Sequence, residues 1–286
     1  MSGPAPTYGG AVVTARDLPE ALALRAQFPE AVVLAGGTDL MVMMEAGQLR
    51  PGRVLNLWGC AGLRTISEDG GHFGALATWT DVARHPAVHP ALRECARTVG
   101  ALQIQNRGTV GGNIVNASPA GDSLPLWLAL DAVFEVASLR GARRIAAADF
   151  WVGYRRTALA PDELLTGVTV APAGADAVLY RKVGTRLAQA ISKVVVGARI
   201  RQVEGTVTEA RIALGSVGPV PLRARRVEAL LVERGLDPDA ADAVVDDIAP
   251  IDDVRSTAVW RRQVAQRVLR RWLVEQRAFS ARNARQ

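Results

Sequence analysis

The sequence is short of the residues that build metal centres and covalent cross-links. Its 286 residues include two cysteines, Cys60 and Cys95, and three histidines. Two distant cysteines outside any C-x-x-C pattern exclude a disulfide scaffold, a Cys-ligated zinc site and a Cys-ligated iron–sulfur cluster. We therefore expect no metal site, and any redox chemistry of this protein does not use iron held by its own thiolates.

Long apolar runs are also absent. No stretch approaches the roughly 18 uninterrupted apolar residues of a membrane span, and the first ten residues, MSGPAPTYGG, lack the basic and apolar regions of a signal peptide. Hydrophobic residues make up 49% of the chain and charged residues 22%, as in an ordinary globular protein. These features predict a cytoplasmic protein without a membrane span.

The common catalytic motifs are missing too. There is no G-x-x-x-x-G-K-[ST], no G-x-G-x-x-G and no G-x-S-x-G, which excludes a P-loop nucleotidase and disfavours a Rossmann site and a hydrolase elbow. His85 and His89 have helical spacing, but Pro86 and Pro90 follow them, so we interpret both as surface histidines. We therefore expect no catalytic residue of the acid, base or nucleophile type.

Positive charge is the one bias in the composition, with a formal net charge of +6. It is concentrated near the C-terminus, where nine arginines accompany one acid, Glu275: Arg255, Arg261, Arg262, Arg267, Arg270, Arg271, Arg277, Arg282 and Arg285. Basic helices can bind phosphates, but no aromatic-stacking or helix-turn-helix pattern accompanies this one. We favour a solvated helix face that meets an acidic protein partner over nucleic-acid binding.

The hydrophobic pattern predicts an α+β protein of two domains, residues 1–176 and 177–286. The first alternates short elements: helix 20–28, strand 31–34, helix 40–46 and strand 54–57. Helical spacing returns over 80–99 with two proline breaks, whereas 104–122 is too rich in Gly, Asn and Ser for a regular helix. After a linker at 171–176 we expect a three-stranded antiparallel sheet (177–183, 192–203, 209–214) and helices over 224–234 and 257–277.

Two diglycine segments, AGGTDL (35–40) and TVGGNI (109–114), each follow a predicted β segment. Adjacent glycines let successive backbone N–H groups converge on an anion with no Cβ in the way. Either segment alone is more typical of a tight turn or bulge than of an anion site. Together, and without a lysine-based phosphate grip, they favour a diphosphate bound by main chain, and hence a dinucleotide cofactor.

The segment SPAGDS (118–123) follows the second glycine pair. Asp122 in such a loop either accepts hydrogen bonds from ribityl or ring N–H groups or caps a helix at 124–130. Its spacing does not distinguish the two.

Five motifs in order resemble the FAD-binding medium subunit of molybdenum hydroxylases, the xanthine dehydrogenase and carbon monoxide dehydrogenase family. They are AGGTDL, IQNRGTVGGNIVNASPAGDSLP, YRKVGTRLAQAISKV (180–194), ARIALGSVGPVPLRAR (210–225) and DDVRSTAVWRR (252–262). The resemblance spans nearly the whole chain. It implies a PCMH-type FAD-binding domain of two subdomains, followed by the small C-terminal domain of that family.

The resemblance also implies which residues contact FAD. Main-chain groups of the two glycine segments would bind its diphosphate, Asp122 matches an FAD-contacting acid, and Lys182 matches a position beside the isoalloxazine. The full expected set is Val33, Leu34, Ala35, Gly36, Gly37, Thr38, Asp39, Leu40, Thr78, Thr109, Val110, Gly111, Gly112, Asn113, Asp122, Leu165 and Lys182.

In that family the large subunit oxidises substrate at a molybdenum cofactor, and a small subunit carries two [2Fe–2S] clusters. The resemblance thus implies a flavin subunit that passes electrons from those clusters to NAD, oxygen or another acceptor, in a dimer of heterotrimers. The substrate would be a purine, another N-heterocycle or an aldehyde. Alternatives are a carbon monoxide dehydrogenase-type flavoprotein subunit, a stand-alone MurB-like flavin reductase, and a basic nucleic-acid-binding or assembly protein with structural glycine loops.

Overall fold

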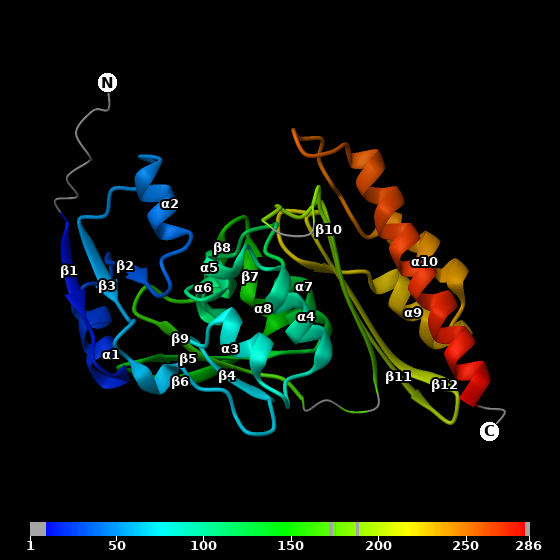
Figure 1. The fold of residues 1–286 in the computed structure, drawn as a ribbon, viewed down its shortest axis with the longest axis horizontal. Coiled ribbons are helices and arrows are strands. Elements are labelled where there is room, and N and C mark those ends of the chain that lie inside the picture. The colour runs from blue at the N-terminus through cyan, green and yellow to red at the C-terminus, as the bar shows by residue number, and fades with distance from the viewer. Residues whose placement is uncertain (1–9, 172–173, 175, 187–188, 284–286) are drawn as a thin grey trace.

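The computed structural model describes residues 10–171, 174, 176–186 and 189–283. Three lobes follow one another along the chain (Figure 1): an N-terminal lobe (10–63), a central lobe (64–171) and a C-terminal lobe (176–283). Helices and strands are mixed in all three, so the predicted α+β class is confirmed.

The N-terminal lobe is a three-stranded parallel sheet, ordered β1-β3-β2, packed with helix α1. Helix α1 begins two residues before the expected 20–28, because the Asp17 carboxylate accepts a hydrogen bond from Glu20 N at 2.9 Å and Pro19 lies in the first turn. The elements are β1 (Ala11–Thr14), α1 (Leu18–Gln27), β2 (Val32–Leu34), α2 (Leu40–Glu45), β3 (Arg53–Asn56) and the 3-10 helix η1 (Ala61–Leu63). β2 leads directly into the first glycine pair.

The central lobe surrounds a four-stranded antiparallel sheet ordered β4-β9-β5-β6. Its core is aromatic: Phe134 meets Phe150 and Trp151 edge to face, and Phe73 meets Trp127 in the same way. The elements are β4 (His72–Gly74), α3 (Trp79–Arg84), α4 (Pro90–Thr98), α5 (Leu102–Gln105), α6 (Val110–Asn116), α7 (Leu124–Ala129), β5 (Val133–Ser138), β6 (Gly141–Ala146), α8 (Ala147–Phe150), β7 (Trp151–Gly153), β8 (Arg156–Thr157) and β9 (Leu164–Thr169).

The structure corrects one prediction in this lobe. Segment 104–122 was expected to hold no regular helix, yet α6 forms over Val110–Asn116 and includes both glycines. Thr109 caps the helix with its side chain, and Ala117 ends it in the left-handed conformation at φ 48°. Two glycines cost a helix roughly 2 kcal/mol in propensity. Burial of Val110 and Ile114 in the core offsets that cost.

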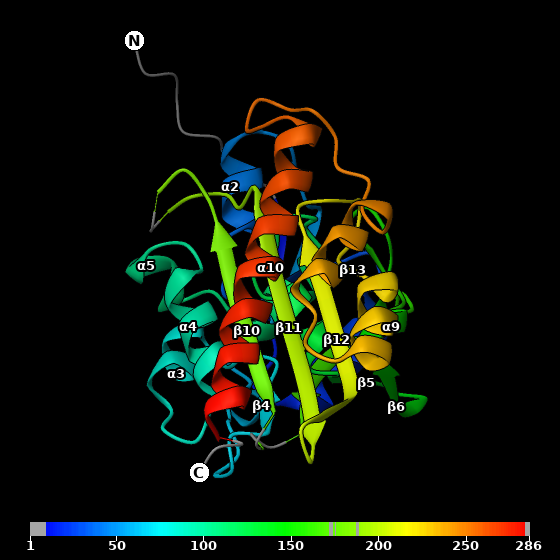
Figure 2. The same cartoon turned by 90° about the vertical axis from the view of Figure 1, so that its right-hand side faces the viewer.

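The C-terminal lobe is an antiparallel sheet ordered β10-β11-β12-β13, and Figure 2 shows α10 and α9 lying across one face of it. The predicted three-stranded sheet is wrong by one strand, because the two-residue β13 is too short to show a periodicity. Glu204 and Gly205 form the turn between β11 and β12. The elements are β10 (Ala177–Val183), β11 (Val194–Val203), β12 (Thr206–Gly215), β13 (Leu222–Arg223), α9 (Arg225–Arg234), the unpredicted 3-10 helix η2 (Pro238–Asp246) and α10 (Ala258–Asn283).

The central and C-terminal lobes meet where α7 packs on β11 and β12. A Cβ on Gly197 would stand 2.7 Å from the Pro125 carbonyl oxygen, and one on Gly215 would stand 2.8 Å from Pro125 Cγ. The sheet backbone therefore lies directly against the helix. Beside this contact the Asp131 carboxylate accepts hydrogen bonds from Arg199 and Arg211.

Some predicted segments lie outside the described residues: Pro172, Ala173 and Ala175 of the expected linker, Leu187 and Ala188 of the YRK motif, and Arg285. Within the described part of the chain, no helix combines the length and the apolar character needed to cross a membrane.

Candidate functional site

A cavity of about 700 Å³ lies between the N-terminal and central lobes. Most of the site residues expected from the sequence line it: Val33, Ala35, Gly36, Gly37, Thr38, Asp39, Leu40, Thr109, Gly111, Gly112, Asn113 and Leu165. Segments about 70 residues apart in the sequence thus reach one site.

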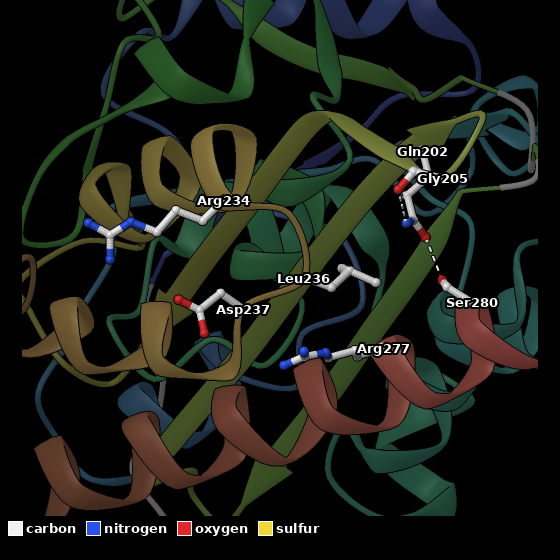
Figure 3. A pocket seen from close by; sticks show the side chains of 7 residues that line it. All are labelled: Gln202, Gly205, Arg234, Leu236, Asp237, Arg277 and Ser280. Carbon is white, nitrogen blue, oxygen red and sulfur yellow. Dashed lines mark hydrogen bonds between the residues drawn. The ribbon is translucent and has the colours of Figure 1, made fainter.

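A smaller hollow of about 370 Å³ lies in the C-terminal lobe, between the β11–β12 turn, the end of α9 and α10 (Figure 3). Its polar contacts are internal, since Gln202 donates a hydrogen bond to Gly205 O and accepts one from Ser280. None of the expected site residues lines it. The larger cavity is therefore the candidate site.

The first glycine pair forms an open loop between β2 and α2. Gly37 has φ 79°, a left-handed conformation that favours glycine. Among the described residues, the main-chain N–H groups of Gly36, Gly37 and Thr38 donate no hydrogen bond. Consecutive N–H groups without a protein acceptor, at the wall of a cavity, form a binding site for an anion.

The second glycine pair is different, because its N–H groups are already used. Val110 N and Gly111 N donate to Ala77 O and Ala75 O at 2.9 and 2.8 Å, and Gly112 N donates to the Thr109 hydroxyl at 3.0 Å. Asn113 N donates to Thr109 O. The expectation that both pairs offer free N–H groups therefore holds only for the first.

Close backbone approach explains why glycine stands in both places. A Cβ on Gly36 would lie 1.9 Å from Arg107 O, and a Cβ on Gly111 would lie 2.7 Å from both Ala75 Cβ and Ala75 O. Neither position has room for a side chain. Gly36 therefore brings the N-terminal lobe against the central lobe, whereas Gly111 packs α6 against the central sheet.

Leu34, Thr78 and Val110 belong to the expected set but stand outside the cavity lining. Thr78 is fully buried and caps α3 in a reciprocal arrangement with Asp81. Leu34 ends β2, and Val110 is buried in the central core.

Asp122 and Lys182 also stand outside this lining, and they pair with each other. Lys182 Nζ lies 2.7 Å from Asp122 Oδ2 and 2.8 Å from Thr98 O, and both side chains are buried. Burial raises the pKa of Asp122, although the Lys182 ammonium opposes the shift. Asp122 Oδ1 is buried without a partner among the described residues. A buried carboxylate oxygen in that state is suited to accept a hydrogen bond from a ligand.

Five polar residues of the lining were not expected from the sequence: Arg25, Asn116, Arg155, Thr157 and Glu163. Asn116 follows Asn113 by one helical turn on α6, a spacing that could have revealed it. Its amide nitrogen donates to the Asp39 carboxylate and its oxygen accepts from Arg155 at 2.9 Å. This series of hydrogen bonds, from Arg155 through Asn116 to Asp39, links the two lobes at the cavity. Arg25 and Arg155 carry no recognisable motif.

The C-terminal arginines are only partly a solvated face. Arg261 is 4% exposed and donates to Ser216 O at 2.9 Å and to the Asp253 carboxylate. Arg270 binds Asp239 and Asp242 of η2. The expectation of a solvated, partner-facing helix face is therefore wrong for Arg261, which is buried, whereas Arg270 stays partly exposed in ion pairs at the surface of the C-terminal lobe.

Two of the three histidines make side-chain hydrogen bonds, His72 with Glu135 and His89 with Ala91 N, whereas Nδ1 of His85 is buried without a partner among the described residues. His89 Nδ1 accepts a hydrogen bond from Ala91 N and caps α4, so it is half-buried rather than free at the surface. Among the residues that the structure describes, no cluster of three or more His, Cys, Asp or Glu side chains could hold a metal ion.

The cavity fits a dinucleotide. Its volume is within the range of small-molecule and cofactor sites, and its lining is apolar at Val33, Leu40 and Leu165. It also supplies the unused N–H groups that a diphosphate requires. These are observations of the chain alone, and they agree with a flavin dinucleotide.

Comparison with known proteins supports the same cofactor. Residues 7–173 match the family model described as the FAD binding domain in molybdopterin dehydrogenase, and residues 179–276 match the CO dehydrogenase flavoprotein C-terminal domain. The chain is 30% identical to the nicotinate dehydrogenase FAD-subunit of Eubacterium barkeri, over 91% of this chain and 93% of that protein. It is also 30% identical to the xanthine dehydrogenase FAD-binding subunit of Escherichia coli O157:H7, over 91% and 94%.

A solved structure gives the same result. Carbon monoxide dehydrogenase from Hydrogenophaga pseudoflava superposes with a TM-score of 0.86 at 29% identity, over 92% of this chain and 95% of that one. The relatives thus include nicotinate, xanthine and carbon monoxide dehydrogenases at similar identity, which does not favour the carbon monoxide alternative. The resemblance inferred from the five motifs is confirmed. This chain belongs to the family of FAD-binding subunits of molybdopterin-dependent dehydrogenases, which are oxidoreductases.

Proposed function

We propose that FAD binds in the cavity between the N-terminal and central lobes, held by the residues expected from the sequence. The N–H groups of Gly36, Gly37 and Thr38 would bind the diphosphate, and Gly112 would let the cofactor come close to the backbone between Thr109 and Asn113, which also line the cavity. The observation that carries the proposal is the row of unused N–H groups on the cavity wall.

Asp122 and Lys182 would contact the flavin from the border of the central and C-terminal lobes. The unpartnered Asp122 Oδ1 supports this role, since it would accept a hydrogen bond from an N–H or hydroxyl group of the cofactor. Lys182 holds that carboxylate in place and keeps a positive charge beside it. Domain boundaries at 1–176 and 177–286 would then put the two partners of this ion pair on different domains.

Bound FAD would supply two-electron redox chemistry and exchange electrons one at a time with iron–sulfur clusters. In this proposal the chain binds and orients the cofactor, and no proton-transfer role is assigned to any of its residues. We propose a large molybdopterin subunit and a small [2Fe–2S] subunit as partners, in a cytoplasmic dimer of heterotrimers. A purine, another N-heterocycle or an aldehyde would be oxidised on the large subunit, and the electrons would leave this chain for an external acceptor.

The visible absorption spectrum of the purified full chain tests the cofactor. We expect flavin bands, or their appearance after incubation with FAD. A chain that shows none in either state would refute the proposal. Affinity purification from the native host tests the partners: co-purification with a molybdopterin subunit and an iron–sulfur subunit is expected. An active monomer with its own substrate would instead support the stand-alone reductase.

A further inference from the structure

The first glycine segment lies against residues 107 and 108, which precede the second segment, and the closest approach is at Gly36. A Cβ on Gly36 would lie 1.9 Å from Arg107 O, 2.7 Å from Arg107 C and 3.1 Å from Gly108 Cα. No other glycine of the described chain has so close a neighbour. The two lobes also share an apolar core that includes Leu76 and Leu164, so this contact bears on the spacing at the glycine loops rather than on the attachment of the lobes as a whole.

Few hydrogen bonds support the contact between Gly36 and Arg107. Among the described residues, none joins 35–38 to 106–113. The hydrogen bond from Asn116 to Asp39 links the same two lobes nearby, but its acceptor is an exposed carboxylate. Van der Waals contact at Gly36 limits how near the loops come, but it does not prevent them from separating.

The side chain of Arg107 supplies the missing attachment. Its guanidinium carbon lies 3.7 Å from the ring centroid of Trp58, which directly follows β3 in the N-terminal lobe. Two hydrogen bonds hold Trp58 in place in turn. Its backbone N–H donates to Asn56 Oδ1, and the backbone N–H of the preceding Leu57 donates to Leu34 O, two residues before Gly36. The stacked Arg107–Trp58 pair therefore joins the base of the first glycine segment, in the N-terminal lobe, to the residue of the central lobe that contacts Gly36.

A second cation lies near the same ring. Arg64 is 5.7 Å from the Trp58 centroid and is bound to Asp81 through two hydrogen bonds of 3.0 and 3.3 Å. Among the described residues Arg107 forms no ion pair, and its guanidinium group instead contacts the indole ring of Trp58. Arginine over tryptophan is the strongest common cation–π geometry.

We propose that Trp58 and Arg107 are positioning residues that form a clasp between the lobes and set the separation of the two sides of the FAD cavity. This inference rests on the proposed FAD site, and it assigns a role to two residues that neither line the cavity nor belong to a glycine motif. The clasp holds the Gly36–Thr38 N–H groups at the distance from α6 that the cofactor requires.

The chain offers a matched control. Arg53 lies 3.8 Å from the Phe28 ring centroid, a similar stack, but both residues belong to the N-terminal lobe. Arg53→Met removes a cation–π contact, together with the exposed Arg53–Glu30 ion pair, without touching the junction. Arg107→Met removes one at the junction and changes an exposed side chain, so folding is expected to survive.

The experiment uses the full chain as apoprotein, in two measurements on wild type, Arg107→Met, Arg53→Met, Trp58→Leu and Trp58→Phe. The first is FAD affinity from a fluorescence titration. We expect Arg107→Met and Trp58→Leu to weaken FAD roughly three- to fivefold, Trp58→Phe to restore most of the affinity, and Arg53→Met to change nothing. The second is amide hydrogen exchange in 35–39 without FAD, expected to quicken only in the junction variants.

Wild-type affinity and wild-type exchange in Arg107→Met would overturn the clasp, as would equal effects of Arg53→Met. If Trp58→Leu does not fold, Arg107→Met still decides the question. If wild type itself binds no FAD, the proposed function fails, while the exchange measurement still shows whether the clasp orders the loop. The two failures are therefore distinguishable.

Discussion

The two glycine pairs look alike in sequence but have different structural roles in the fold. Gly36 and Gly37 form an open loop with unused N–H groups, whereas Gly111 and Gly112 open a capped helix whose N–H groups are satisfied. One pair offers donors to a ligand, and the other lets α6 approach the central sheet. A diglycine motif therefore indicates close backbone approach, and only its hydrogen bonds show whether the partner is a ligand or the protein.

The largest effect should come from Gly111→Val. The new side chain would meet Ala75 in the core, where overpacking costs about 3 kcal/mol of the free energy of unfolding. Chemical denaturation should show it in the transition that involves the central lobe. Gly112→Ala is the matched control, because its Cβ would meet chiefly the Thr109 hydroxyl. Equal losses in the free energy of unfolding in both variants would contradict the different roles of the two glycine pairs.

Cofactor removal should give the next largest effect. A ligand that binds only the folded state at one hundred times its Kd stabilises a protein by about 2.7 kcal/mol, so FAD should raise the denaturation midpoint of wild type. In Gly36→Ala the Cβ would force the loop away from Arg107, and the FAD-dependent rise should disappear. Thermal melts with and without FAD measure this. A full rise in Gly36→Ala would remove the ligand role of the first pair.

Thr109→Val should cost about 1 kcal/mol, the usual value of a lost helix cap. The substitution keeps the shape of the buried side chain but leaves Gly112 N without its acceptor. Thr109→Ser keeps the hydroxyl and should be close to wild type in urea denaturation. An unchanged midpoint for Thr109→Val would show that the second pair does not depend on its cap.

The smallest effect is expected from Asp39→Ala. Asp39 precedes α2 as Thr109 precedes α6, but its side chain makes no capping hydrogen bond. The substitution removes only the exposed hydrogen bond from Asn116 and should therefore cost about 0.5 kcal/mol in the same assay. A loss as large as that of Thr109→Val would mean that the Asp39–Asn116 link between the lobes contributes as much as the cap of α6.

The sequence predicted what depends on local pattern. Helix α1, the proline breaks between α3 and α4, and strand β10 at Ala177–Val183 all follow from residues with strong local preferences. It failed at α6, where tertiary packing outweighs the low helix propensity of glycine, and at β13, which exists only through its pairing with β12. Local preference does not include the energy of contacts made by distant segments.

The site shows the same division. Most residues of the two glycine segments could be placed at one cavity from their motifs, because glycine pairs leave a visible signature. Arg25 and Arg155 could not, since a lone arginine in a helix or a hairpin turn looks like surface charge. The pairing of Asp122 with Lys182 could not be predicted either, because it joins residues 60 positions apart across two lobes.

The contact of α7 with Gly197 and Gly215 has a consequence for engineering. Because the helix lies against bare sheet backbone, the shape of each lobe is moulded to the other at this boundary. A chimaera that takes its C-terminal lobe from a relative should therefore also take α7, although that helix precedes the lobe in sequence. The natural unit of exchange in this chain crosses the boundary that sequence motifs would draw.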